Sequence, residues 1–248
     1  MSEAAFSFGI VGEARADRDA ACGLADRVLL EDVHWLDAET LDAYRHWRGF
    51  TPEAHFLRWA SVSDEWKLLG LKPIFGEFGE QPDARMARKA LLLFAQAERR
   101  PDAVVLMRDS DAQRDSTGLE QARDHNPWPF KVIIGLAHPK RECWVLAGFD
   151  PKSAQEVECL AKEERRLSFH PVRDAHLLTA REHGAKKDAK VALDALTQSD
   201  KERERECLEE TALETLRERG GNTGLTTYLA EVRERLVPIL MGHSPTET

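Results

Sequence analysis

The sequence is poor in cysteine, with four in 248 residues and no CxxC pair among them. The cysteines are scattered along the chain, at Cys22, Cys143, Cys159 and Cys207. This spacing counts against a disulfide framework and against a zinc site of the usual pattern. We therefore expect reduced thiols and, with them, a cytoplasmic protein.

Long apolar runs and a leader segment are also missing. No stretch approaches the roughly 18 consecutive apolar residues that a membrane-spanning helix needs. The first residues, MSEAAFSFGIVGE, have no basic segment before their apolar stretch, so we expect no signal peptide. Hydrophobic residues make up 42% and charged residues 32%, a composition typical of a soluble globular protein without a membrane partner.

Positive charge is in deficit, with 35 Lys and Arg against 44 Asp and Glu and a net charge of −9. This balance counts against a surface that holds nucleic acid through overall charge. It does not exclude an enzyme that acts on nucleic acid, because basic residues can cluster locally and metal ions can offset acidic ligands.

The most informative stretch is AVVLMRDSD at Ala103–Asp111, a compact apolar run that ends in two carboxylates. A short run rich in β-branched residues and closed by polar ones predicts a buried strand of a parallel sheet. Ligands bind beyond the carboxyl ends of such strands. Asp109 and Asp111 can therefore converge on one divalent cation, although a solvated turn after the strand is an open alternative.

A second carboxylate pair follows the first predicted strand, Phe6–Gly12. Glu13 lies on the turn after this strand, where it would share the edge of the sheet with Asp109. Asp17 opens a predicted helix, Asp17–Leu29, whose apolar residues recur at helical spacing. A carboxylate in a first helical turn is also favourable with the helix dipole, so a purely structural role for Asp17 stays open.

A third acid follows the predicted strand Phe130–Ala137. The strand ends at His138 and Pro139, and Glu142 comes just beyond, beside the start of a helix. Glu142 can also be interpreted as a first-turn helix carboxylate. We interpret His138 as a turn or capping residue and not as a ligand.

The rest of the chain is assigned from periodicity. Val33–Leu71 holds four of the six tryptophans and is interpreted as an insertion or irregular connection, whose aromatic residues pack a small satellite core more readily than they stack on bases. The other predicted elements are a short strand at Lys72–Gly79 and helices at Asp83–Arg99, Thr117–Asp124, Lys152–Arg165, Lys186–Leu196, Ser199–Arg219 and Gly224–Leu240, with Asn222 as the cap of the last. We thus expect an α/β domain at residues 1–150, a helical region at 151–241 packed on it, and a loose tail at 242–248.

The predicted strand ends together contribute five carboxylates: Glu13, Asp17, Asp109, Asp111 and Glu142. In a parallel sheet these junctions lie on one edge, where like charges repel unless cations sit among them. One or two Mg²⁺ or Mn²⁺ ions would relieve that repulsion. Two metals about 4 Å apart can activate water and stabilise the leaving oxygen in phosphodiester hydrolysis.

A Glu after the first strand in GIVGE, an Asp four residues on and a DxD after a later strand resemble the toprim domain. That fold is shared by type IA and II topoisomerases, bacterial primases and the overcoming-lysogenization-defect (OLD) nucleases. Four further segments are similar to small OLD-like toprim proteins of bacterial defence loci: GEARADRDAACGLADRVL, IIGLAHPKRECWVLAGFDP, KKDAK and NTGLTTYLAEVRERLVPIL. The resemblance covers most of the chain outside Val33–Leu71.

The resemblance implies a Rossmann-like, mostly parallel sheet flanked by helices, with a helical C-terminal part. It implies that Glu13 is an acid/base and metal-site residue and that Asp109 and Asp111 are metal ligands. Asp17 matches an extra acid of OLD-like members, and Glu142 matches a late acidic residue. Lys187 and Lys190 are the candidates for a lysine that offsets charge on the phosphate.

The function implied is Mg²⁺- or Mn²⁺-dependent cleavage of nucleic acid, with DNA as the expected substrate, by the nuclease subunit of an antiviral defence system. The ATPase half of full-length OLD proteins has no counterpart here, so an ATPase partner would be a separate chain. Assembly into an oligomer is left open.

Two alternatives to a nuclease come from other classes. A phosphatase of the haloacid-dehalogenase type would use the first Asp of DxD as its nucleophile, but that motif usually follows the first strand. A non-catalytic interaction or regulatory subunit would use the charged helical half, from Asp150 onward, as its binding face.

Overall fold

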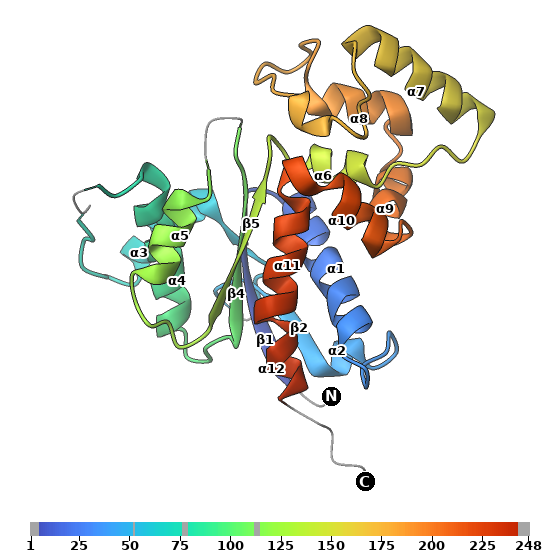
Figure 1. The fold of residues 1–248 in the computed structure, drawn as a ribbon. Coiled ribbons are helices and arrows are strands. Elements are labelled where there is room, and N and C mark those ends of the chain that lie inside the picture. Colours follow the sequence, from blue (N-terminus) through green and yellow to red (C-terminus); the bar gives the residue numbers. More distant parts are fainter. Residues whose placement is uncertain (1–4, 52, 76–78, 112–114, 243–248) are drawn as a thin grey trace. The chain divides into compact units, whose positions relative to one another are not determined.

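The computed structural model describes residues 5–51, 53–75, 79–111 and 115–242 (Figure 1). The chain forms two compact units that are interleaved along the sequence. Unit 1 comprises residues 1–108, 115–135 and 230–248, and unit 2 comprises residues 109–114 and 136–229. Among the described helices, none combines the length and the apolar character that a membrane span needs.

The central sheet has five parallel strands: β1 (Phe6–Gly12), β2 (Arg45–Arg48), β3 (Leu57–Arg58), β4 (Ala103–Asp109) and β5 (Lys131–Ala137). Their order is β2-β1-β4-β5, and β3 pairs with the end of β1. The register pairs Phe8 with Ala103 and Val11 with Leu106. The predicted parallel sheet is therefore confirmed, as is the strand at Phe6–Gly12.

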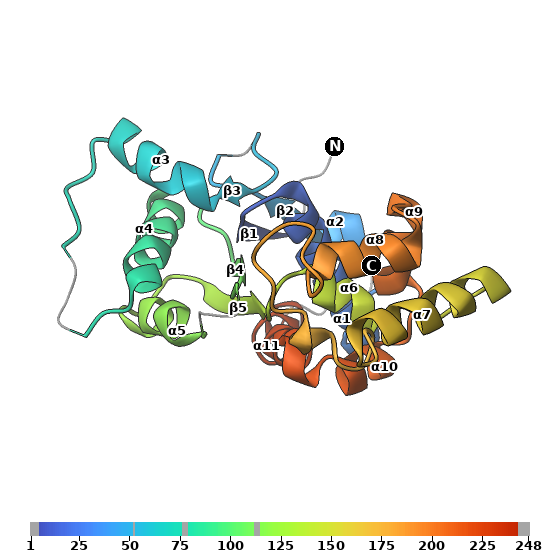
Figure 2. The same ribbon diagram turned by 90° about the horizontal axis from the view of Figure 1, so that it is seen from above.

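Helices cover both faces of the sheet in unit 1, which explains the apolar residues at successive positions of β1 and β4. One face carries α3 (Val62–Leu68), α4 (Pro82–Gln96) and α5 (Thr117–Asp124), and the other carries α1 (Arg15–Asp32), which contacts α12 (Val237–Met241) (Figures 1 and 2). Ile10 and Val105 are fully buried as a result. A Cβ on Gly9 would lie 2.6 Å from the ring of Phe94, so glycine permits the close approach of α4.

The tryptophan-rich segment 33–71 belongs to the sheet more fully than the sequence predicts. Besides α2 (Leu41–Tyr44) and α3 it supplies β2 and β3, so the predicted irregular connection contains two short strands. Packing is confirmed for three of its four tryptophans, since Trp47, Trp59 and Trp66 are all at least 93% buried. The Trp47 ring lies 5.2 Å from that of Phe8, and the Trp59 indole N–H donates to the Met107 carbonyl at 2.7 Å.

Unit 2 is mainly helical. It holds α6 (Glu142–Ala147), α7 (Ala154–Leu167), α8 (Ala189–Thr197), α9 (Lys201–Glu209), α10 (Leu213–Arg219) and the first turn of α11 (Leu225–Arg235). Trp144 is fully buried, stacks on Tyr228 at 5.1 Å and donates to the Thr223 carbonyl. Gly224 has φ +79° and a Cβ there would meet the Leu136 carbonyl oxygen, so this close approach requires glycine.

Several predicted element boundaries are wrong. The single helix predicted at Ser199–Arg219 is two, α9 and α10, and between them the Thr211 hydroxyl donates to the Gly148 carbonyl. The helix predicted at Gly224–Leu240 divides at Leu236, because Pro238 has no N–H for a helical bond. Asn222 lies inside a short 3₁₀ segment instead of capping α11. Residues 72–75 form no strand, and 76–78, like the tail 243–248, lie outside the described residues.

Candidate functional site

The boundary between the two units passes between Arg108 and Asp109 and so divides the predicted site residues. Glu13 and Asp17 belong to unit 1, and Asp109, Asp111, Glu142, Lys187 and Lys190 belong to unit 2. The predicted placement after strand ends is confirmed: Glu13 follows β1, Asp109 ends β4, and Glu142 opens the helix after β5.

In unit 1, Asp17 is bound to the start of its own helix. Its side-chain oxygen Oδ2 accepts from the backbone N–H of Glu13 at 3.1 Å and of Ala14 at 2.9 Å. Asp17 is 9% exposed and lies in the first turn of α1. The carboxylate thus satisfies N–H groups that a helix start leaves without intrahelical partners, and it complements the helix dipole. These bonds account for Asp17 as a structural residue.

Glu13 faces an arginine that the sequence did not single out. Arg108 Nε lies 3.9 Å from Glu13 Oε1, and Arg108 Nη1 lies 3.2 Å from Asp83 Oδ1. The Arg108 guanidinium also stacks 5.3 Å from the ring centre of Trp59, and its side chain is 14% exposed. One largely buried cation therefore serves two carboxylates in unit 1, and Glu13 does not stand as an isolated negative charge.

In unit 2, the chain after β4 is tied to the chain after β5. Ser110 N–H donates to the Ala137 carbonyl at 2.8 Å, and Asp111 N–H donates to the Pro139 carbonyl at 3.0 Å. The Arg141 backbone N–H donates to Asp109 Oδ1 at 2.8 Å. Residues 109–111 and 137–142 therefore form one hydrogen-bonded group, which we call the β4–β5 junction.

The β4–β5 junction brings Asp109 to the start of α6, of which Glu142 is the first residue. Glu142 Oε1 forms an ion pair with Arg141 Nη2 at 3.1 Å, and the two side chains are 17% and 12% exposed. Asp109 and Glu142 both act electrostatically on the thiol of Cys143, whose pKa is raised mainly by burial. Asp111 has φ +50°, a left-handed conformation that Asp tolerates better than most residues.

The junction also contains a serine–histidine pair. Ser110 is fully buried, and its hydroxyl lies 2.8 Å from His138 Nδ1 and 3.5 Å from the Pro139 carbonyl. A hydroxyl that donates to Pro139 accepts from His138 Nδ1–H. Burial, together with the neighbouring His176, lowers the pKa of His138 below its ordinary value. His138 thus stays neutral near pH 7, and its role in the turn is consistent with the sequence interpretation.

The two predicted lysines lie elsewhere in unit 2. The Lys187 ammonium lies 5.7 Å from the ring centre of Phe169, and Lys190 is in the first turn of α8 with its N–H bound to Asp188. Among the described residues, no ion pair joins either lysine to Asp109, Asp111 or Glu142. The structure instead places Lys140, in the junction, near Asp188, whose pKa it helps to lower.

Oxygen donors of the kind found here suit Mg²⁺ or Mn²⁺ in chemical type. The described part of the chain contains no group of three or more His, Cys, Asp or Glu side chains gathered as a metal site. The junction supplies orientation instead: Asp109 is held by a backbone N–H and Glu142 by Arg141. The residue types fit the predicted ion, and the junction holds two of the acids in defined positions.

Three residues beside the predicted acids were not predicted from the sequence: Arg108, Arg141 and Ser110. Arg108 and Arg141 stand directly beside predicted acids in RDSD and PKRE, so adjacency was an available signal for both. Ser110 carries no such signal, because its burial depends on β5 lying next to β4.

Comparison with protein-family models, with curated proteins and with solved structures finds no match for this chain. The fold and the junction define its class by themselves: an α/β protein with an all-parallel sheet, helices on both faces and acids after three strand ends.

Proposed function

We propose that this protein is a divalent-metal-dependent hydrolase of nucleic-acid phosphodiesters. Asp109, Asp111 and Glu142 are the proposed metal-binding acids of unit 2. Glu13 and Asp17, the acids of unit 1, enter the proposal from the sequence pattern alone. The observation that supports it best is the β4–β5 junction, where long-range hydrogen bonds hold the backbone of Ser110 and Asp111 and the side chain of Asp109.

In this proposal Asp109, Asp111 and Glu142, which are not already gathered as a metal site in the described part of the chain, would together hold Mg²⁺ or Mn²⁺. The bound ion would supply an activated water and charge stabilisation for the leaving oxygen. The Arg141 N–H orients Asp109 in advance, as partners of metal ligands commonly do. Arg141 and Lys140 add positive charge next to the acids, which favours an anionic phosphodiester. The resemblance to OLD-like proteins adds DNA as the substrate and a separate ATPase as the partner in a defence system.

The test is calorimetric titration with Mn²⁺ of the wild type and of Asp109→Asn/Asp111→Asn. Asparagine at 109 keeps an acceptor for the Arg141 N–H, so the junction stays tied while charge is lost. Glu214→Gln/Glu218→Gln, two exposed acids of α10, makes the same charge change elsewhere in unit 2. We expect Mn²⁺ binding in the wild type and control and none in the junction variant, with DNA cleavage lowered more than about 100-fold.

Wild-type protein that binds no Mn²⁺ and cleaves neither DNA nor RNA would contradict the proposal. That result would favour the alternative of a non-catalytic interaction subunit, which one observation supports. Arg108 faces Glu13 and Arg141 faces Glu142, so protein cations already offset acids in both units.

A further inference from the structure

One segment reverses the charge balance of the chain. Residues 162–190 hold eight Lys and Arg against five Asp and Glu, a net charge of +3. The whole chain carries −9, so the rest carries −12. The segment lies wholly in unit 2, from the second half of α7 to the start of α8. It is therefore a local basic region in an acidic protein.

The exposed side chains of the segment are richer in positive charge than its sequence, because acids of the segment are buried while most of its bases are exposed. Seven of the eight basic residues are exposed: Lys162, Arg165, Arg173, Arg181, Lys186, Lys187 and Lys190. Glu163 and Asp188 are buried, and of the five acids only Glu164 and Glu182 are exposed. The surface of the segment is thus far more positive than its sequence.

The two buried acids have their partners within the segment. Glu163 forms an ion pair with Arg166 at 2.6 Å. Asp188 accepts from the N–H groups of Gly184 and Lys190 and lies 3.2 Å from His183 Nδ1. Although burial raises it, these N–H groups lower the pKa of Asp188, helped by Lys140 and His183. Glu163 is thus offset by Arg166, and Asp188 is bound by partners of the segment itself.

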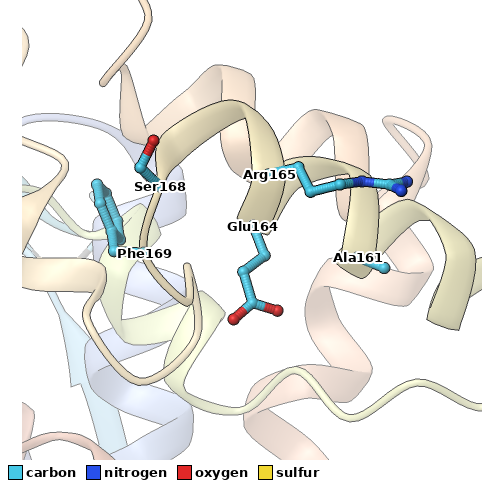
Figure 3. A pocket seen from close by; sticks show the side chains of 5 residues that line it. All are labelled: Ala161, Glu164, Arg165, Ser168 and Phe169. Atoms are coloured by element: carbon cyan, nitrogen blue, oxygen red, sulfur yellow. The ribbon is translucent and has the colours of Figure 1, made fainter.

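The basic side chains are carried on a folded framework. Arg166 Nη1 donates to the Lys186 carbonyl at 2.6 Å, which ties the end of α7 to the loop before α8. Within that loop, Ala180 N–H donates to the Lys187 carbonyl, and the Lys187 ammonium lies over the ring of Phe169. Arg165 and Phe169 line one hollow at the end of α7, into which Glu164 points (Figure 3). An anion is therefore expected at the basic rim and not in the hollow.

We propose that the exposed basic residues of 162–190 bind the phosphate backbone of a nucleic acid. This inference rests on the proposed function, for which it would be the surface that holds the substrate. Several cations spread over a folded surface match a polymer with a regular series of phosphates. Inside unit 2, Lys140 of the β4–β5 junction acts electrostatically on Asp188 of this segment.

The test measures binding in EDTA, so that it does not depend on metal or cleavage. A fluorescein-labelled DNA duplex of random sequence is titrated by anisotropy with wild type and with Arg165→Glu/Arg181→Glu/Lys186→Glu, which leaves Lys187 and Lys190 in place. Lys67→Glu/Lys72→Glu/Arg85→Glu, three exposed bases of unit 1, changes the net charge equally. We expect the first variant to weaken binding at least about tenfold and to reduce the slope of log K against log salt by about 3.

A second variant, Arg165→Gln/Arg181→Gln/Lys186→Gln, removes the positive charges without adding negative ones and should lose an intermediate amount of DNA affinity. Thermal unfolding of each variant separates a loss of contacts from misfolding. Equal binding by both charge-reversal variants would overturn the inference. So would a wild type that ignores the duplex but sediments with phosphatidylserine vesicles. A wild type that binds the duplex through these residues yet neither binds Mn²⁺ nor cleaves would uphold this surface and contradict only the proposed hydrolysis.

Discussion

The acids after β1 in unit 1 and the acids of the β4–β5 junction in unit 2 each include one carboxylate bound by backbone N–H groups and one that faces an arginine. The two pairs differ in how far along the chain these partners lie. Asp17 accepts from residues three and four positions before it, whereas Arg108, which faces Glu13, comes from β4. Asp109 accepts from Arg141, 32 positions away, whereas the arginine that faces Glu142 is its direct neighbour. In unit 1 the N–H donors are thus close to the acid in sequence and the arginine is distant. In unit 2 the N–H donor is distant in sequence and the arginine is adjacent.

The contrast separates what a helix needs from what the fold adds. Any helix start gains from a carboxylate such as Asp17, so its hydrogen bonds require no further function. The bond between Asp109 and Arg141 exists only because two strand ends lie side by side. A long-range arrangement that holds a carboxylate is stronger support for a site than a local one, and the proposed function therefore gives more weight to unit 2.

The largest loss of stability is expected when Arg108, the cation that faces the acids of unit 1, is replaced. Arg108→Met leaves Glu13 and Asp83 without their shared partner, in surroundings where Asp83 is only 20% exposed. We expect the free energy of unfolding to fall by about 2–3 kcal/mol, because a partly buried charge loses its counter-ion. Urea unfolding measures the loss.

The matched rescue is Arg108→Met/Glu13→Gln/Asp83→Asn, which removes the two carboxylate charges together with the arginine. It should recover at least half of the lost stability if charge is the cause. A triple variant no more stable than Arg108→Met would show that Arg108 acts through its packing on Trp59 and not through Glu13 and Asp83.

Loss of the Asp17 carboxylate at the start of α1 should lower the stability less than loss of Arg108. Asp17→Ala removes the acceptor of two N–H groups and should lower the free energy of unfolding by about 1–2 kcal/mol, whereas Asp17→Asn keeps an acceptor and should lose less. Asp19→Ala on the same helix is the control, since Asp19 is exposed and bonds only arginine side chains. If Asp17→Ala and Asp19→Ala were equally mild by urea unfolding, the structural account of Asp17 would be wrong.

Much of the sheet could be predicted from the sequence because its information is local. The apolar run at Val104–Met107 needs cover on both faces, so its composition alone indicates a buried parallel strand. Strand ends followed by acids could be found in the same way. The strand at Arg45–Arg48 was missed because RHWR has no apolar alternation, and its place in the sheet comes from pairing with β1.

The finer structure of the site depends on contacts that no local pattern records. The split between α9 and α10 accompanies a hydrogen bond from Thr211 to Gly148, 63 positions away. The exposed charge of residues 162–190 could not be predicted from composition, because it depends on the burial of Glu163 and Asp188. Lys187 and Lys190 are candidates through the resemblance alone, and the structure places Lys187 at Phe169 and the Lys190 N–H at Asp188.

The smallest effect we predict concerns pH and the junction of unit 2. The pKa of His138 is lowered by burial and by His176, so on acidification the unfolded chain takes up a proton at this histidine before the folded one. Stability should therefore be full above about pH 6.5 and fall as pH drops below that value. His138→Asn, which can still bond the Ser110 hydroxyl, should show a shallower fall in urea unfolding between pH 7 and 5, and His34→Asn, at an exposed histidine, should match the wild type. Identical slopes for wild type and His138→Asn would show that the Ser110–His138 pair adds nothing to the pH dependence of stability. This long-range contact would then no longer distinguish the junction of unit 2 from the acids of unit 1.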